Sequence, residues 1–181
     1  MIETAQRIYV KFQQIANSLQ SPFLLLIRLY WGWQFLETGW GHLTHLDKVT
    51  AYFGDLGIPF PGLNAPFVSV LEFVGGISLV LGLASRPIAF LLSCNMFVAF
   101  VTGDRESLLS IFSDPDKFYA AAPYTFLFAS LLVLIFGPGR FCLDTLIAKR
   151  FAPVETGKEA MPSGLQLGMR LRSRAVDMLD P

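Results

Sequence analysis

Four long apolar stretches dominate the sequence, and short polar segments separate them. A helix of about 20 apolar residues crosses the ~30 Å hydrocarbon layer of a bilayer. In lipid such a stretch must be helical, because no water is present to hydrogen-bond its backbone. Pro and Gly residues lie at the ends of these stretches, where helices start and stop. The sequence therefore predicts four transmembrane helices, at Pro22–Gly41, Asn64–Leu83, Pro87–Gly103 and Tyr119–Phe136.

The residues before the first stretch follow an amphipathic pattern. Ile8, Phe12, Ile15 and Leu19 recur at helical spacing, with polar and basic side chains on the other faces. The pattern predicts a helix on the cytoplasmic membrane surface, and it lacks the basic start and apolar centre of a signal peptide. The predicted fold is thus all-α, an integral membrane bundle of four transmembrane helices (residues 22–145). An N-terminal amphipathic interfacial helix (1–21) precedes the bundle, and a cytoplasmic linker with a basic tail (146–181) follows it.

The distribution of Lys and Arg predicts the orientation. Cytoplasmic loops of membrane proteins carry an excess of these residues. With the N-terminus inside, the outer loops hold only Lys48, Arg105 and Lys117 of the 14 Lys and Arg residues. Both termini are therefore expected in the cytoplasm. The 14 acidic residues balance the basic ones, so no net positive charge suggests nucleic acid as a partner.

Composition decides against the main alternative fold, a soluble helical bundle. Hydrophobic residues make up 53% of the chain and charged residues only 15%, whereas soluble domains carry about 25% charged residues. The two cysteines, Cys94 and Cys142, form neither a CxxC pair nor a zinc-binding spacing, so buried and inert thiols are the simpler interpretation.

Three of the polar side chains within the predicted spans lie at depths that an extended arginine could connect. These are Arg28 in the first, Glu72 in the second and Asn95 in the third. An ionisable group in lipid costs about 2.5–3.5 kcal/mol on insertion scales, so each one suggests a functional site. From the rise of ~1.5 Å per residue we expect the three to form one intramembrane cluster. Two interpretations stay open, an ion pair that fixes helix register and a polar site for a quinone headgroup or a proton-transfer step.

A second group of residues lies on the opposite face of the first span. Tyr30, Trp33, Glu37 and Trp40 share a helical stripe there. Trp and Tyr concentrate at the headgroup level, so this stripe is either at the wet outer boundary of the membrane or in contact with a partner subunit.

The only two histidines, His42 and His45, follow the first span at a spacing of one helical turn. They could face a common metal ion, but two ligands in one loop are weak evidence, and solvated histidines are the simpler interpretation. No catalytic triad, phosphate loop or dinucleotide fingerprint is visible. We therefore expect no metal, no catalytic residue and no firmly held cofactor in this chain alone, with quinone, lipid or neighbouring pigments as its candidate ligands.

Several short motifs, in order along the chain, resemble the DoxX family of small bacterial membrane proteins. The resemblance runs from about Leu24 to Leu146. Its pieces are Arg28-Leu29, Gly32, Phe35 and Gly39-Trp40, then Leu56-Gly57-Ile58-Pro59, then Glu72 with Gly75-Gly76 and Leu81-Gly82-Leu83 before Arg86, and finally Gly137 to Asp144.

The resemblance implies a four-helix protein of the bacterial inner membrane. Similar proteins include subunits of a thiosulfate:quinone oxidoreductase and members of other membrane redox complexes. We therefore expect an accessory or anchoring subunit of a respiratory or photosynthetic electron-transfer complex, whose partners are the lipid bilayer and other membrane subunits. The alternative is a quinone-interacting oxidoreductase subunit. A small-molecule transporter is a third hypothesis, against which the lack of an internal repeat speaks.

Overall fold

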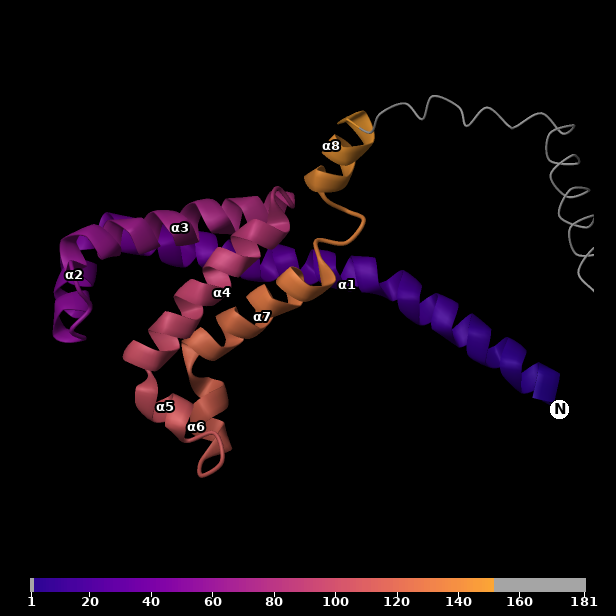
Figure 1. The fold of residues 1–181 in the computed structure, drawn as a ribbon, viewed down its shortest axis with the longest axis horizontal. Coiled ribbons are helices and arrows are strands. Elements are labelled where there is room, and N and C mark those ends of the chain that lie inside the picture. Colours follow the sequence, from indigo (N-terminus) through magenta and orange to yellow (C-terminus); the bar gives the residue numbers. More distant parts are fainter. Residues whose placement is uncertain (1, 152–181) are drawn as a thin grey trace, which may run out of the picture. The chain divides into compact units, whose positions relative to one another are not determined.

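The computed structural model describes residues 2–151, and over this range the chain forms helices and connecting loops only (Figure 1). The predicted all-α class is confirmed for this range. The linker and basic tail beyond Phe151 lie outside the described residues. The helices are α1 (Ile2–Thr44), α2 (Leu46–Asp55), α3 (Pro61–Leu81), α4 (Ser85–Thr102), α5 (Arg105–Leu109), α6 (Pro115–Ala120), α7 (Ala122–Phe136) and α8 (Leu143–Phe151).

Two of the described helices, α3 and α4, are long and apolar enough to cross a membrane. The apolar helix α7 has 15 residues and begins later than the predicted span at Tyr119. The early start was wrong because Ala121 is extended and separates α6 from α7. Pro123 follows in the first turn of α7, where its missing N–H costs nothing.

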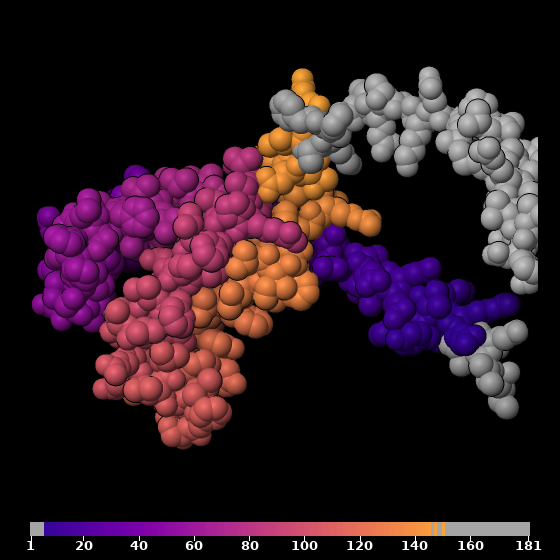
Figure 2. Space-filling model, viewed as in Figure 1, coloured from indigo at the N-terminus to yellow at the C-terminus, as the bar shows by residue number. Residues whose placement is uncertain are grey.

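The first helix is longer than predicted. The sequence predicts a separate surface helix that ends before Pro22, whereas α1 continues through Pro22 to Thr44. Proline removes one backbone hydrogen bond from a helix interior, here the bond to the Ser18 carbonyl. Ser18 is exposed, as are all residues from Gln6 to Gln20 (Figure 2), so water can satisfy that carbonyl. The boundary at residue 21 was therefore wrong as a helix end.

Helices α1 and α3 pack with their backbones in close contact, and glycines make this possible. A Cβ atom on Gly76 of α3 would lie 2.5 Å from the backbone nitrogen of Leu36 and 2.6 Å from the carbonyl oxygen of Gly32. On α1, a Cβ on Gly39 would collide with the backbone of Glu72 and Phe73. No residue larger than glycine fits at these positions without moving a helix.

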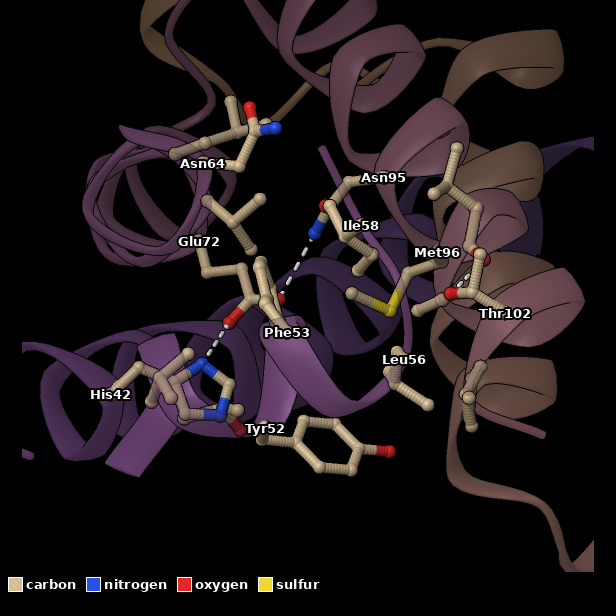
Figure 3. A pocket seen from close by; sticks show the side chains of 18 of the residues that line it. His42, Tyr52, Phe53, Leu56, Ile58, Asn64, Glu72, Asn95, Met96 and Thr102 are labelled. Atoms are coloured by element: carbon tan, nitrogen blue, oxygen red, sulfur yellow. Dashed lines mark hydrogen bonds and ion pairs between the residues drawn. The ribbon is translucent and has the colours of Figure 1, made fainter. Parts of the chain in front are cut away.

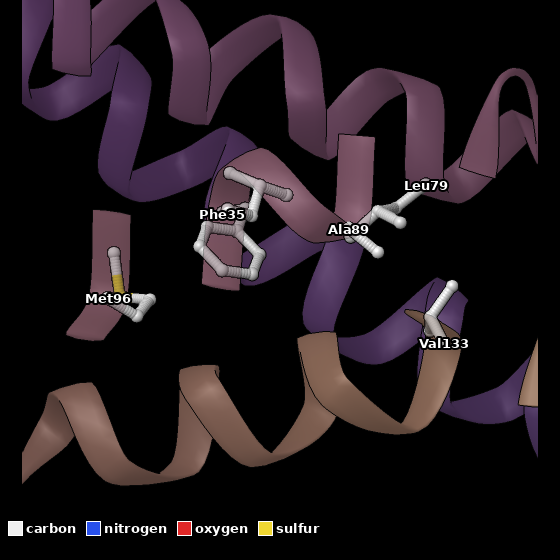
Figure 4. Close-up of a cluster of buried hydrophobic side chains, with 6 residues drawn as sticks. Phe35, Leu79, Ala89, Met96 and Val133 are labelled. Carbon is white, nitrogen blue, oxygen red and sulfur yellow. The ribbon is translucent and has the colours of Figure 1, made fainter. Parts of the chain in front are cut away.

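The second helix pair is α4 and α7, and the main core lies between the two pairs (Figure 4). Phe35 of α1 and Leu79 of α3 meet Val133 of α7 there, and all three are buried. The connection from α3 to α4 is a tight turn at Gly82, whose φ of +70° is accessible to glycine at little cost. From this turn, α3 and α4 run apart toward their other ends (Figure 1).

Arg28 closes the bundle at the end where α3 and α4 meet. Its guanidinium donates to four backbone carbonyls that end α3 or follow α7, and its side chain is almost fully buried. The acceptors are Leu79 (2.8 Å), Val80 (3.2 Å), Pro138 (2.6 Å) and Phe141 (2.9 Å). The last carbonyls of a helix lack intrahelical partners and carry partial negative charge, so a cation stabilises this site.

Asp144 completes the same end of the bundle. Its carboxylate accepts from the backbone N–H groups of Ala84 (2.7 Å) and Ser85 (3.0 Å), at the start of α4. A negative charge at a helix N-terminus satisfies free N–H donors and is favoured by the helix dipole. Arg28 and Asp144 thus neutralise opposite helix ends on the two sides of one turn.

Two glycines of α3 test the close packing of α1 on α3. Gly76→Ala should lower the free energy of unfolding, because its Cβ has no room between Gly32 and Leu36. Gly62→Ala is the matched control, because a Cβ there meets nothing within 4 Å, and alanine should stabilise the helix by about 0.5–1 kcal/mol. Thermal unfolding in detergent measures both, and equal effects of the two substitutions would contradict the packing.

Arg28→Met should destabilise the protein by about 3 kcal/mol, because several buried carbonyls lose a charged donor at once. The control is Arg86→Met, which alters an exposed arginine near the same turn. The effect should add to that of Glu72→Gln, because Arg28 and Glu72 share no hydrogen-bond partner. Strong coupling between the two substitutions in a double-mutant cycle would contradict this separation.

Candidate functional site

The predicted cluster of Arg28, Glu72 and Asn95 is only partly assembled. The structure brings together Glu72 and Asn95, whose side-chain amide donates to Glu72 Oε1 over 3.0 Å. Arg28 is elsewhere, on the carbonyls at the end of α3. Its placement beside Glu72 was wrong because side chains on a helix point toward the helix N-terminus, which carries the guanidinium of Arg28 away from Glu72.

The second partner of Glu72 is His42. Its Nδ1 atom lies 2.9 Å from Glu72 Oε2, so each carboxylate oxygen has one side-chain partner (Figure 3). The carboxylate itself is buried, while the His42 side chain is partly exposed. The site therefore joins three helices, with His42 from α1, Glu72 from α3 and Asn95 from α4.

The position of His42 follows from the helical period. His42 lies fourteen residues after Arg28 on the same inward stripe, three residues beyond Gly39. Gly39 packs directly on the backbone at Glu72. The sequence-based interpretation of His42 as solvated missed this contact because it stopped the stripe at the predicted end of the span, although α1 continues to Thr44.

The Glu72 site opens into a pocket with a volume of about 810 Å³. This volume is within the range of about 300–1,000 Å³ that is typical of small-molecule sites. Apolar and aromatic side chains form most of its wall, and α2 with the segment after it covers one side (Figure 3). Residues from this cover include Tyr52, Phe53, Leu56 and Ile58. A buried carboxylate at the wall of an apolar pocket is a favourable place for a ligand with one polar end.

The other predicted residues lie outside the pocket. Tyr30, Trp33, Glu37 and Trp40 are all exposed on α1. His45 does not converge with His42, because its Nδ1 contacts the Gly41 carbonyl and the Thr44 hydroxyl, each at 3.0 Å. Among the described residues, no group of three His, Cys, Asp or Glu side chains is placed to hold a metal ion.

The contact with Glu72 changes the acid–base behaviour of His42, which follows the predicted span. The hydrogen bond to the carboxylate raises the pKa of His42 above the ordinary value for histidine, and partial burial opposes the increase. A histidine whose pKa is raised by a buried carboxylate holds its proton more tightly than an ordinary histidine, and proton transfer is a chemistry that this site can support.

Fold and site together define an all-helical protein with a polar group at the wall of an apolar pocket and with two helices long and apolar enough to cross a membrane. The sequence model of the DoxX family matches residues 23–105, a range that contains His42, Glu72 and Asn95. The chain belongs to the DoxX family, and it is a membrane protein.

Relatives with curated names agree with this assignment. The chain is 27% identical to "Inner membrane protein YqjF" of Escherichia coli over 75% of this chain and 99% of that protein. It is 30% identical to "Uncharacterized membrane protein Rv3486" of Mycobacterium tuberculosis over 71% of this chain and 83% of that protein. It is 24% identical to "Putative oxidoreductase CatD" of Bacillus subtilis, over 69% and 87% respectively. No solved structure matches the chain.

Glu72→Gln should lower the pKa of His42, because the imidazolium loses its charged acceptor. A histidine NMR titration measures this pKa, with the His42 resonance assigned through His45→Gln. Glu37→Gln is the control, since it removes an exposed carboxylate from the same helix. An unchanged His42 pKa in Glu72→Gln would show that the two side chains do not interact in solution.

Proposed function

We propose that this chain is the quinone-binding membrane subunit of an electron-transfer complex. The observation that carries the proposal is the His42–Glu72–Asn95 site at the wall of an apolar pocket. A quinone matches this combination of polar and apolar surfaces, because its carbonyl oxygens are polar and the rest of the molecule is apolar. The relative named "Putative oxidoreductase CatD" supports a redox function of this kind.

The polar groups suit the two oxidation states of a quinone. The side chains of His42 and Asn95 can each donate a hydrogen bond to a quinone carbonyl, while Glu72 holds both in place. Reduction to the quinol consumes two electrons and two protons. A partner subunit supplies both electrons. His42 supplies one proton to the ring oxygen beside it, and the second proton, for the other ring oxygen, comes from water. Because the His42 side chain is partly exposed, it can recover that proton from water.

The proposal includes four membrane spans and two cytoplasmic termini. The spans are the part of α1 between Pro22 and Gly41, then α3, α4 and α7. The positions of Lys and Arg support this topology, with Arg86 and Arg140 on the cytoplasmic side and few basic residues on the other. In this orientation the His42–Glu72–Asn95 site lies toward the periplasmic side.

The exposed stripe Tyr30, Trp33, Glu37 and Trp40 is the proposed contact with the partner subunit. Glu37 faces outward from α1, and nothing in the described range pairs with it. A carboxylate that faces hydrocarbon is costly, and contact with another protein removes the cost. With this contact the accessory-subunit and the quinone-binding hypotheses are compatible. The quinone site lies on this chain and the electron donor lies on the partner subunit.

The chain's two histidines provide the test of the quinone site. His42→Leu should reduce the quinone that remains with the complex after purification from native membranes by about tenfold or more, since a charged hydrogen bond contributes about 1.5–3 kcal/mol. His45→Leu is the matched control and should retain wild-type amounts. Extraction and chromatography measure quinone per chain.

Circular dichroism and thermal unfolding show whether His42→Leu is still folded. A folded His42→Leu protein with wild-type quinone content would refute the proposed function. A wild-type complex that retains no quinone would refute it as well.

A further inference from the structure

One wall of the pocket is open at the depth of the hydrocarbon layer. Leu91, Cys94 and Val98 line the pocket and are also exposed on the surface of the protein. Their spacing of three and four residues places them on one face of α4. They lie in the middle of α4, a helix that is long enough to cross a membrane. This face of α4 therefore borders the pocket and is also exposed, and in the proposed topology it lies within the bilayer.

The opposite edge of this opening is Phe67 of α3, which lines the pocket and is 61% exposed. No charged residue lies on α4 between Ile88 and Thr102, or on α3 between Leu63 and Leu71. An opening without charges favours a hydrocarbon chain and disfavours water. Because α3 and α4 run apart from the turn at Gly82, the opening lies between two helices that do not close on each other (Figure 1).

On its aqueous side the pocket is bordered by the charged residues Lys48 and Asp104, which disfavour a hydrocarbon chain there. Tyr52 and Phe53 of α2, with Leu56 and Ile58 of the segment that follows, lie over the pocket (Figure 3). The polar end of the pocket at Glu72 and its apolar opening on α4 thus suit a molecule with a polar ring inside and a hydrocarbon tail outside.

We propose that Phe67, Leu91, Cys94 and Val98 form a lateral portal through which the tail of a long-chain quinone leaves the pocket into the bilayer. The inference rests on the proposed function and adds the substrate class, a quinone dissolved in the membrane instead of a water-soluble one. The ring lies beside Glu72 and Asn95, and the tail passes between α3 and α4. The ligand enters and leaves sideways, without crossing the membrane surface.

Neighbouring residues on α4 allow a matched test. Leu91 lines the pocket, whereas Phe90 is similarly exposed and does not. The probes are a benzoquinone with a decyl tail and the same ring without a tail, and the His42 resonance in nanodiscs reports occupancy of the ring site. Leu91→Trp should lower the affinity for the tailed quinone about tenfold, which corresponds to about 1.4 kcal/mol. The affinity for the tailless quinone should fall less than about twofold, since only the tail needs the portal. Phe90→Trp should change neither affinity.

The outcomes separate the portal from the proposed function. Selective loss of the tailed quinone in Leu91→Trp supports the portal. Equal changes for both quinones, or none, overturn the portal and leave the ring site intact. A His42 resonance that responds to neither quinone in the wild-type protein overturns the ring site, and the portal with it. A photoreactive group at the end of the tail gives an independent readout, and cross-links on α2 instead of Phe67 or Cys94 would also overturn the portal.

Discussion

The buried guanidinium of Arg28 determines how the rest of the bundle is arranged. A charge in this position is unfavourable unless most of its donors are satisfied, and four carbonyls from two separate segments satisfy them. These carbonyls belong to the end of α3 and to the loop after α7. One side chain of α1 therefore holds α1, α3 and that loop together at the same end of the bundle. With that end held together, α3 and α4 are free to diverge above it, and the pocket occupies the space between them.

Much of the helical architecture can be predicted from the sequence. An apolar stretch of about 20 residues in lipid is restricted to an α-helix, because its backbone has no water to bond. The ends of α3 and α4 accordingly lie within three residues of their predicted bounds. The end of α1 was less predictable. Proline at residue 22 stops a helix only if the lost hydrogen bond is not compensated, and an exposed turn at Ser18 compensates it. Such local hydration cannot be inferred from the pattern of residues.

The site could be predicted less completely than the helices. The depths of Glu72 and Asn95 along their helices were enough to expect their contact. The depth of Arg28 was misleading. An arginine side chain reaches about as far along the helix axis as the differences in depth between the three residues, so the direction in which it points decides which partner it meets. His42 could have been found by extending the stripe of Arg28 and Gly39 by one turn. The cover formed by α2 has no such signal, since it depends on how a loop folds over the pocket.

The continuity of α1 through Pro22 has a mechanical consequence. A helix of 43 residues acts as a rod, but a rod that lacks one backbone hydrogen bond bends most easily at that turn. From Arg28 to His42 the rod is held by carbonyls at one end and by a carboxylate at the other, with glycine contacts to α3 between them. A force on the exposed turns from Gln6 to Gln20 is therefore expected to bend α1 near residue 22. The part of α1 that carries His42 stays stiff, and the position of the imidazole is isolated from whatever the N-terminal half contacts.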